Sequence, residues 1–368
     1  MKITLYMPDL QLGGAERMFV NLANNFASRG FFVDLVLNKR QGHYLDEVSS
    51  QVNVIELGVE NSRYAIPKFT FYLLKNRPDR ILSTLFHANL VSIISCALTG
   101  NLTRCYIRQE NVTKEINKSK SLRSRIYFML TKLLYPFANG FIGISKGVVD
   151  DFVGKGLVDS KKSYVVHNPA ITDSIDDLSK ANITHPWFSS DYYTFINVSR
   201  LNIAKNQSLL IRAFRNVVGV YPRSRLLLVG EGELREDLEK LSIALGLENY
   251  IDFVGSQKNP FSWMKKSDCF VFSSSWEGFG NVLVEALYCC GNVISTDCPS
   301  GPSEILENGK YGVLVPVDDE DALTFEMIRK VKEDCSKFIG DCPSSYMRFH
   351  IDVISEKYLQ VLRVDEVS

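Results

Sequence analysis

The sequence has little that would place it in or across a membrane. No apolar stretch reaches the roughly 18 residues that a transmembrane helix needs. No apolar core follows a basic tip at the start of the chain, where Met1–Met7 is typical of a first strand and not of a signal peptide. These absences predict a cytoplasmic protein without a membrane-spanning helix.

Patterns for disulfides and metal sites are also absent. The eight cysteines include no C-x-x-C pair, and no group of histidines, cysteines and acids has the spacing of a metal site. We therefore expect reduced thiols in the core. Asp318-Asp319 imitates a metal-binding pair, but it follows Pro316 in a loop and is expected to cap a helix.

The charge is balanced over the whole chain but not along it. The 42 basic and 42 acidic residues cancel. Residues 1–170 nevertheless hold 22 Lys and Arg against 13 Asp and Glu, a net charge of +9, and the remaining residues carry −9. The N-terminal half is therefore suited to an anionic partner.

Short apolar strands alternate with amphipathic segments, the pattern of a parallel sheet covered by helices. A polar stretch without periodicity, residues 170–191, separates two such series, so the sequence predicts two α/β domains. A final amphipathic helix is expected at 345–362. The predicted strands are Ile3–Met7, Phe32–Leu37, Val52–Glu56, Ile81–Thr84, Cys105–Ile107, Gly140–Ile144, Tyr164–Val166, Tyr193–Asn197, Arg225–Val229, Ile251–Val254, Cys269–Ser273, Asn292–Ser295 and Gly312–Leu314.

The segment Trp276–Leu287 is the most informative in the chain. Glu277 and Glu285 lie eight positions apart, and Gly278 and Gly280 lie between a buried strand and a predicted helix. A glycine loop at a helix N-terminus favours an anion, because its amide groups are unpaired and the helix dipole is positive there. A carboxylate one turn inside that helix suits the paired hydroxyls of a sugar. The segment therefore predicts a nucleotide-sugar site.

Further blocks follow in order along the chain. They are Gly13-Gly14-Ala15-Glu16-Arg17, Ser199-Arg200-Leu201 with Lys205-Asn206, residues 228–235, Phe253-Val254-Gly255, and residues 295–305. With the E-x7-E segment, they resemble family 4 of the retaining GT-B glycosyltransferases over nearly the whole chain. The resemblance implies two Rossmann-like β/α/β domains facing a central crevice. Residues 1–170 would bind the acceptor, with a crossover helix at 345–368, and residues 171–344 would bind the nucleotide-sugar.

The resemblance also implies a set of site residues. The donor-binding residues are expected to be Gly13, Gly14, Arg200, Lys205, Val254, Gly255, Glu277, Gly278, Phe279, Gly280, Asn281, Val282, Leu283 and Glu285. Catalysis is expected to depend on His87, Arg200, Lys205 and Glu277. Arg200 and Lys205 would stabilise the charge that grows on the departing pyrophosphate, so neither a metal nor another cofactor is expected. Gly13-Gly14 would cradle phosphate, let the backbone approach the sugar, or form only a tight turn.

Two polar positions follow strands of the first domain, at the end that faces the crevice in such folds. Family members often place a histidine where His87 stands, near the sugar hydroxyls, although a lone histidine is more often structural. Glu110 would accept an acceptor hydroxyl or act as its base, or it would only pair with Arg108.

Residues 114–132 hold six basic residues and one acid. At helical spacing, the inward face would be Leu122, Ile126, Met129, Leu130 and Leu133, and the outer face Arg125, Phe128, Lys132 and Tyr135. Together with Arg123, this outer face suits an anionic membrane surface, and the alternative is a solvated basic face. Nucleic acid is not expected, because the aromatics do not alternate along a strand or groove.

We therefore expect a cytoplasmic, metal-independent glycosyltransferase that is peripheral on the inner face of the plasma membrane. It would move a hexosyl or N-acetylhexosaminyl group, with retention, from a UDP-linked donor to a lipid-diphosphate-linked glycan in lipopolysaccharide, O-antigen or capsule assembly. The alternatives are a soluble transferase of this fold with a small acceptor and a catalytically silent nucleotide-sugar-binding protein.

Overall fold

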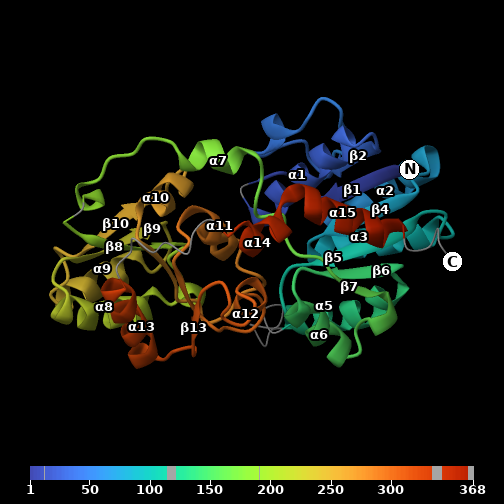
Figure 1. Ribbon diagram of the computed structural model, residues 1–368. Helices are drawn as coiled ribbons and strands as arrows, with labels where there is room; N and C mark the ends of the chain where they lie inside the picture. The colour runs from blue at the N-terminus through green and yellow to red at the C-terminus, as the bar shows by residue number, and fades with distance from the viewer. Residues whose placement is uncertain (12, 114–121, 190, 334–341, 364–368) are drawn as a thin grey trace. The chain divides into compact units, whose positions relative to one another are not determined.

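The computed structural model describes residues 1–11, 13–113, 122–189, 191–333 and 342–363, with backbone alone at 122–124. The chain divides into two compact units, Met1–Pro169 with Ile351–Ser368, and Ala170–His350 (Figure 1). The first boundary lies one residue from the expected position. The chain returns to the first unit at Ile351, six residues later than the expected position 345. The short turns at 343–349 belong to the second unit instead.

The first unit is a seven-stranded parallel sheet with the order β3-β2-β1-β4-β5-β6-β7. The strands are β1 (Lys2–Met7), β2 (Phe32–Leu37), β3 (Asn53–Glu56), β4 (Arg80–Thr84), β5 (Arg104–Gln109), β6 (Gly140–Gly143) and β7 (Ser163–Val165). The helices are α1 (Gly14–Ser28), α2 (Ala65–Asn76), α3 (Phe86–Leu98), α5 (Leu122–Leu134), α6 (Lys146–Gly154) and α15 (Ile351–Arg363). Short 3-10 turns lie at Leu45–Glu47, Ser62–Tyr64, Tyr135–Phe137 and Ser160–Lys162.

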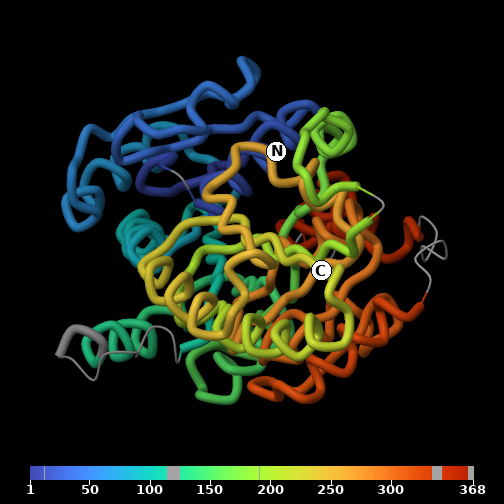
Figure 2. The backbone as a smooth tube through the Cα atoms, turned by 90° about the vertical axis from the view of Figure 1, so that its left-hand side faces the viewer, coloured from blue at the N-terminus to red at the C-terminus, as the bar shows by residue number. Residues whose placement is uncertain are grey.

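The last helix, α15, completes the first unit by packing on α1. Its apolar face, including Ile354, Tyr358 and Leu362, is buried in the core. On the surface, Arg29 pairs with Glu356 at 3.0 Å. Figures 1 and 2 show the red C-terminal helix beside the blue N-terminal part of the chain. The first unit is therefore built from both ends of the sequence.

The second unit is a six-stranded parallel sheet with the order β10-β9-β8-β11-β12-β13. The strands are β8 (Tyr193–Val198), β9 (Ser224–Val229), β10 (Ile251–Gly255), β11 (Cys269–Phe272), β12 (Val293–Thr296) and β13 (Val313–Val315). The helices are α7 (Ser174–Ser179), α8 (Gln207–Val220), α9 (Arg235–Ala244), α10 (Phe261–Lys266), α11 (Asn281–Cys289), α12 (Pro302–Ile305), α13 (Glu320–Lys332) and α14 (Pro343–Tyr346). Short 3-10 turns lie at Pro186–Phe188, Ile203–Lys205 and Met347–Phe349.

All the predicted strands are present, each within two residues of its expected bounds. Strands that helices cover on both faces are apolar along their whole length, and this is why runs such as β1, buried from Ile3 to Met7, were recognisable. A smaller prediction is also confirmed. Asp319 caps α13, its Oδ1 accepting from the Ala322 amide at 2.8 Å.

The cysteines that the structure describes are free thiols, and six of these seven are buried. Cys335 lies outside the described residues. Among the described helices, none is both long enough and apolar enough to cross a membrane.

Candidate active site

The strand order of the second unit reverses between β8 and β11. The chain runs from β8 to β9 and β10 on one side, and from β11 to β12 and β13 on the other. At such a point, the loops that leave the carboxyl ends of the two central strands diverge and open a ligand site. Here these loops are residues 199–206 after β8 and 273–280 after β11. Both loops hold residues that the sequence predicted as functional.

Lys205 and Glu277 meet at this switch point. Lys205 Nζ forms a salt bridge with Glu277 Oε1, although 72 positions separate the two residues. Ser274 Oγ donates to the same carboxylate oxygen at 2.9 Å. The side chains of Lys205 and Glu277 are only 21% and 13% exposed, so the pair is partly withdrawn from water, where its attraction is stronger than on an open surface. The structure thus brings together two of the predicted catalytic residues.

Serines after β11 hold the Lys205 loop in place. Ser273 Oγ donates to the Lys205 carbonyl at 2.8 Å, and the Ser275 amide donates to the Ala204 carbonyl at 2.8 Å. Asn206 adopts a left-handed conformation, with φ of 48°, and donates from Nδ2 to Ser275 Oγ at 3.2 Å. The sequence analysis did not select these serines. The polar run directly after a buried strand was the available signal.

Arg200 lies on the same loop as Lys205 but has a different partner. Its guanidinium pairs with Glu233 at 3.3 Å, and the two side chains are 71% and 56% exposed. An ion pair this exposed contributes little to stability. Among the described residues, no contact joins the Arg200 side chain to Lys205 or Glu277. Arg200 is therefore available to an incoming anion at small cost.

The two glycines after β9 allow the loops to pack closely. A Cβ on Gly230 would lie 2.0 Å from the Ser199 carbonyl oxygen, and one on Gly232 would lie 2.1 Å from that of Leu201. These glycines therefore bring the loop after β9 against the loop that carries Arg200. Next to them, at the end of β10, the Gly230 amide donates to the Gly255 carbonyl at 3.0 Å, and Val254 precedes Gly255.

The predicted glycine loop before α11 has the expected geometry. Gly280 is the N-cap of α11 with φ of 99°, a conformation that favours glycine. Phe279 is buried and packs edge-on against Phe349, with ring centres 5.5 Å apart, and Leu283 is also buried. Only the backbone of these two residues is therefore suited to a ligand. The remaining predicted residues here are half-buried: Gly278, Asn281, Val282 and Glu285.

The first unit has its own switch point, between β1 and β4. The loop after β1 leads into Gly13 and Gly14, which open α1, and the loop after β4 leads into His87 in the first turn of α3. Leu85, just before α3, has φ of 71°, which lies in the left-handed region. Three residues predicted from two separate motifs therefore lie at the switch point of one sheet.

Glu16 is an unpredicted member of this group. A Cβ on Gly13 would lie 2.1 Å from Glu16 Oε2, so the carboxylate occupies the space over this glycine. Burial raises the pKa of Glu16, and Glu110 and Asp9 raise it further, while a hydrogen bond from its own amide and the charge of Arg108 oppose the rise. Because a carboxylate already lies at the start of α1, the loop is less suited to phosphate. A glutamate at the third helical position is a known capping signal and could have been recognised.

Two aromatic rings flank His87, which is otherwise exposed. Tyr127 lies edge-on to the imidazole, with ring centres 5.4 Å apart, and its hydroxyl is 3.5 Å from His87 Nε2. Phe86 also meets the ring edge-on at 5.4 Å. The resulting desolvation lowers the pKa of His87, so the imidazole is neutral near pH 7. The sequence analysis did not select Tyr127, which comes from the distant helix α5.

Glu110 pairs with Arg108, as one of the two interpretations expected. Arg108 is fully buried. It also donates from Nε to the Tyr358 hydroxyl of α15 at 3.0 Å, from Nη1 to Thr84 Oγ1 at 2.9 Å, and from Nη2 to Asn168 Oδ1. The Glu110 side chain is 25% exposed, so one partner of this buried cation still reaches solvent.

The predicted faces of the basic helix are wrong for α5. Tyr135, expected outside, is buried, and its hydroxyl donates to Gln109 Oε1 at 3.3 Å. Phe128 is half-buried rather than exposed. Three residues expected inside are exposed, namely Ile126 (40%), Met129 (60%) and Leu133 (61%).

Arg125 and Lys132 are exposed, as expected, whereas the side chain of Arg123 and residues 114–121 lie outside the described residues. The exposed face of α5 is therefore apolar and basic rather than aromatic and basic.

The chain is similar to known glycosyltransferases. The family model "Glycosyltransferase Family 4" matches residues 12–174, and "Glycosyl transferases group 1" matches residues 181–337. An uncharacterised glycosyltransferase of Methanocaldococcus jannaschii is 32% identical over 308 residues, which cover 76% of this chain and 74% of that protein. The N-acetylgalactosamine-N,N'-diacetylbacillosaminyl-diphospho-undecaprenol 4-alpha-N-acetylgalactosaminyltransferase of Campylobacter jejuni is 29% identical over 343 residues, 90% of each chain.

Solved structures agree on the fold. Anabaena HepE in complex with UDP aligns with a TM-score of 0.80 at 22% identity, over 98% of this chain and 99% of that one. The lipopolysaccharide outer core galactosyltransferase WaaB aligns with a TM-score of 0.76 at 17% identity, over 99% and 100%. Two parallel sheets, each with polar residues at its switch point, define a protein of the GT-B fold. The chain belongs to glycosyltransferase family 4.

Proposed function

We propose that this chain transfers a sugar, with retention and without a metal, from a UDP-linked donor to a lipid-diphosphate-linked glycan in cell-surface polysaccharide assembly. The observation that carries the proposal is the Lys205–Glu277 pair at the switch point of the second sheet. It sets a fixed cation and a carboxylate side by side at the start of a glycine loop. This combination suits a ligand that has both a diphosphate and sugar hydroxyls.

In the proposed reaction, the bond between the anomeric carbon and the diphosphate breaks, and a bond from the acceptor oxygen forms on the same face. The proton of the acceptor hydroxyl passes to the leaving phosphate oxygen. Lys205 and Arg200 stabilise the charge that develops on the diphosphate. The exposed Glu233 is readily displaced from Arg200, whereas Glu277 holds Lys205 in position before the donor arrives. Glu285 accepts hydrogen bonds from the ribose hydroxyls.

The first unit would supply the acceptor side. Neutral His87 and the carboxylates of Glu16 and Glu110 are groups that bind hydroxyls, and they follow β1, β4 and β5. Glu16 over Gly13 favours backbone approach to a sugar over a phosphate cradle. The name of the Campylobacter relative describes an undecaprenol-diphosphate-linked acceptor, and HepE was solved with UDP-glucose. Both names support the substrate classes proposed here.

The exposed face of α5 supports a peripheral contact with an anionic membrane. Ile126, Met129 and Leu133 present apolar surface beside the cations of Arg125 and Lys132. Apolar insertion next to basic charge is the usual composition of an interfacial helix. A lipid-linked acceptor at the inner face of the plasma membrane would then be within reach of the enzyme.

The donor assignment is tested by measuring the melting temperature of the full chain against a panel of nucleotides and nucleotide-sugars. A donor that binds only the folded state raises the melting temperature, by about 2.7 kcal/mol of stabilisation at one hundred times its Kd. We expect UDP and one or more UDP-sugars to do so, and Glu285→Gln to weaken UDP binding by about 1.5–3 kcal/mol in calorimetry. If no UDP-sugar shifts the parent, or if Glu285→Gln binds UDP unchanged, the corresponding assignment is wrong. UDP release without any lipid-linked acceptor product would favour a small soluble acceptor.

A further inference from the structure

Helix α2 of the first unit carries a second basic and apolar surface. Residues 61–77 contain four Lys and Arg and no Asp or Glu. Within α2, Phe71 is 67% exposed and Leu74 is 48% exposed. Lys68 and Lys75 stand one helical turn or less from these apolar side chains. The surface therefore combines positive charge with exposed apolar area, the same composition as the exposed face of α5.

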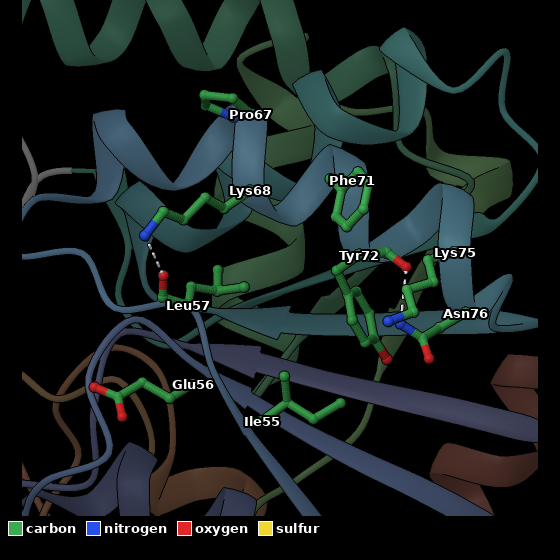
Figure 3. Close-up of a pocket in the computed structure, with 9 residues that line it drawn as sticks. All are labelled: Ile55, Glu56, Leu57, Pro67, Lys68, Phe71, Tyr72, Lys75 and Asn76. Carbon is green, nitrogen blue, oxygen red and sulfur yellow. Dashed lines mark hydrogen bonds between the residues drawn. The ribbon is translucent and has the colours of Figure 1, made fainter.

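A pocket of about 420 Å³ lies next to this surface, between α2 and the edge strand β3 (Figure 3). Phe71 and Tyr72 come from α2, and Ile55 and Leu57 come from β3 and the residue that follows it. The remaining lining residues are Glu56, Pro67, Lys68, Lys75 and Asn76. The pocket is thus largely apolar, with charged and polar side chains at its ends.

The two lysines of the pocket have different roles. Lys68 Nζ donates to the carbonyls of Leu57 at 2.8 Å and Gly58 at 3.1 Å, so it fastens the start of α2 to the end of β3 (Figure 3). Lys75 and the neighbouring Arg77 form no ion pair with any residue that the structure describes. These two cations, at the far end of α2, are therefore available to an anionic headgroup.

The position of α2 in the first unit relates this pocket to α5. α2 packs on α3, and α3 packs on α5. The connections that contain α2, α3 and α5 lead to β4, β5 and β6 in turn, all in one direction across the sheet. Because such crossovers are right-handed, the three helices cover the same face. The exposed surfaces of α2 and α5 therefore belong to one helical layer.

We propose that this pocket binds an acyl chain of an anionic phospholipid, with Lys75 and Arg77 on its phosphate. The ligand is a lipid of the bilayer and not the glycan-bearing acceptor. The inference rests on the proposed membrane contact of α5 and extends it, because it adds a second, separately testable docking site. The positive charge of residues 61–77 complements the anionic headgroup, and the apolar lining of the pocket complements the acyl chain of the lipid.

The role of the two cations is tested by measuring how the full-length protein binds phosphatidylcholine vesicles, with and without phosphatidylglycerol. Lys75→Ala with Arg77→Ala should weaken binding to the anionic vesicles about 30-fold, because each charge near the surface contributes roughly fivefold. The control pair Arg215→Ala with Lys240→Ala removes two exposed cations from the second unit and should bind like the parent. Melting temperatures and stabilisation by UDP should match the parent in both variants.

Binding of the acyl chain in the pocket is tested with the Phe71→Trp variant of the protein. The vesicles have acyl chains that carry bromine, which quenches tryptophan fluorescence on contact. The fluorescence of this tryptophan should be quenched by brominated anionic vesicles, whereas Phe325→Trp, on α13 of the second unit, should not be quenched. If Lys75→Ala with Arg77→Ala pellets like the parent, or if Phe71→Trp is not quenched, the lipid pocket is refuted. A loss of pelleting in Arg125→Ala with Lys132→Ala would still leave the α5 contact standing. Parent-like pelleting in both pairs of variants would overturn both membrane contacts.

Discussion

The Lys205–Glu277 pair allows the donor site to be tested with one nearly isosteric change, Glu277→Gln. The amide keeps the size of the carboxylate and its contact with Ser274, but it leaves the Lys205 ammonium without a counter-charge. Hydrogen bonds to charged groups contribute about 1.5–3 kcal/mol. The two side chains retain 21% and 13% exposure, so partial screening reduces the expected loss to about 1–2 kcal/mol.

For a unit of this size, that loss corresponds to a melting temperature about 2–8 °C lower without ligand. UDP should reverse the loss, because its diphosphate gives Lys205 a new partner. The stabilisation by UDP should therefore be larger in Glu277→Gln than in the parent. Turnover of the UDP-sugar should fall, because the carboxylate that we propose to bind the sugar is gone.

The matched control is Glu236→Gln, which removes a carboxylate that is 87% exposed and 4.0 Å from Lys240. It should change stability by less than about 0.5 kcal/mol and leave turnover unaltered. Differential scanning fluorimetry with and without UDP, together with UDP-release kinetics, measures both effects. The reasoning fails if Glu277→Gln binds UDP more weakly than the parent while it keeps parental turnover.

Three further results are expected. Lys205→Ala should lower turnover about 100-fold or more, and EDTA should leave the parent unaffected; strict dependence on added magnesium or manganese would contradict the metal-free reaction. Because the pKa of His87 is lowered in the folded state, the unfolded chain binds its proton more readily, so His87 should reduce stability as the pH falls below about 6.5. His87→Gln should flatten that part of the curve of melting temperature against pH, and an unchanged curve would show that His87 is not desolvated. Met129→Ser with Leu133→Ser should reduce pelleting with anionic vesicles at high salt as well as at low salt, because apolar insertion, unlike charge, is not screened.

The fold could be predicted from the sequence largely because parallel strands covered on both faces are apolar along their whole length. The switch-point residues were also predictable, because a glycine or polar run directly after such a strand marks the carboxyl edge of the sheet. The pairing of Lys205 with Glu277 could not be predicted from the sequence. It depends on β8 and β11 being neighbours in the sheet, and no local sequence pattern encodes that order.

The faces of α5 were misassigned for a different reason. Helical spacing groups residues but does not say which group meets the sheet. The largest apolar group was assumed to face inward, yet α5 buries Thr131, and the turn after it buries Tyr135, whose hydroxyl has polar partners in Gln109 and Asn89. A tyrosine with buried hydrogen-bond partners packs as well as a leucine, so apolar count alone gave the wrong face. Glu16 was missed because its role comes from folding back over Gly13.

The buried guanidinium of Arg108 has a consequence for how the protein is made. Its hydrogen bonds reach Tyr358, which is synthesised 250 positions later. While the ribosome is still adding the second unit, the first unit has all seven of its strands but lacks the helix that covers α1 and supplies Tyr358 to this cation. Arg108 already has its ion pair with Glu110, but its Nε is without the Tyr358 hydroxyl, and the apolar core beneath α15 stays open to water. The N-terminal unit, although translated first, therefore reaches its final state last, and the second unit folds as an insertion within an open partner.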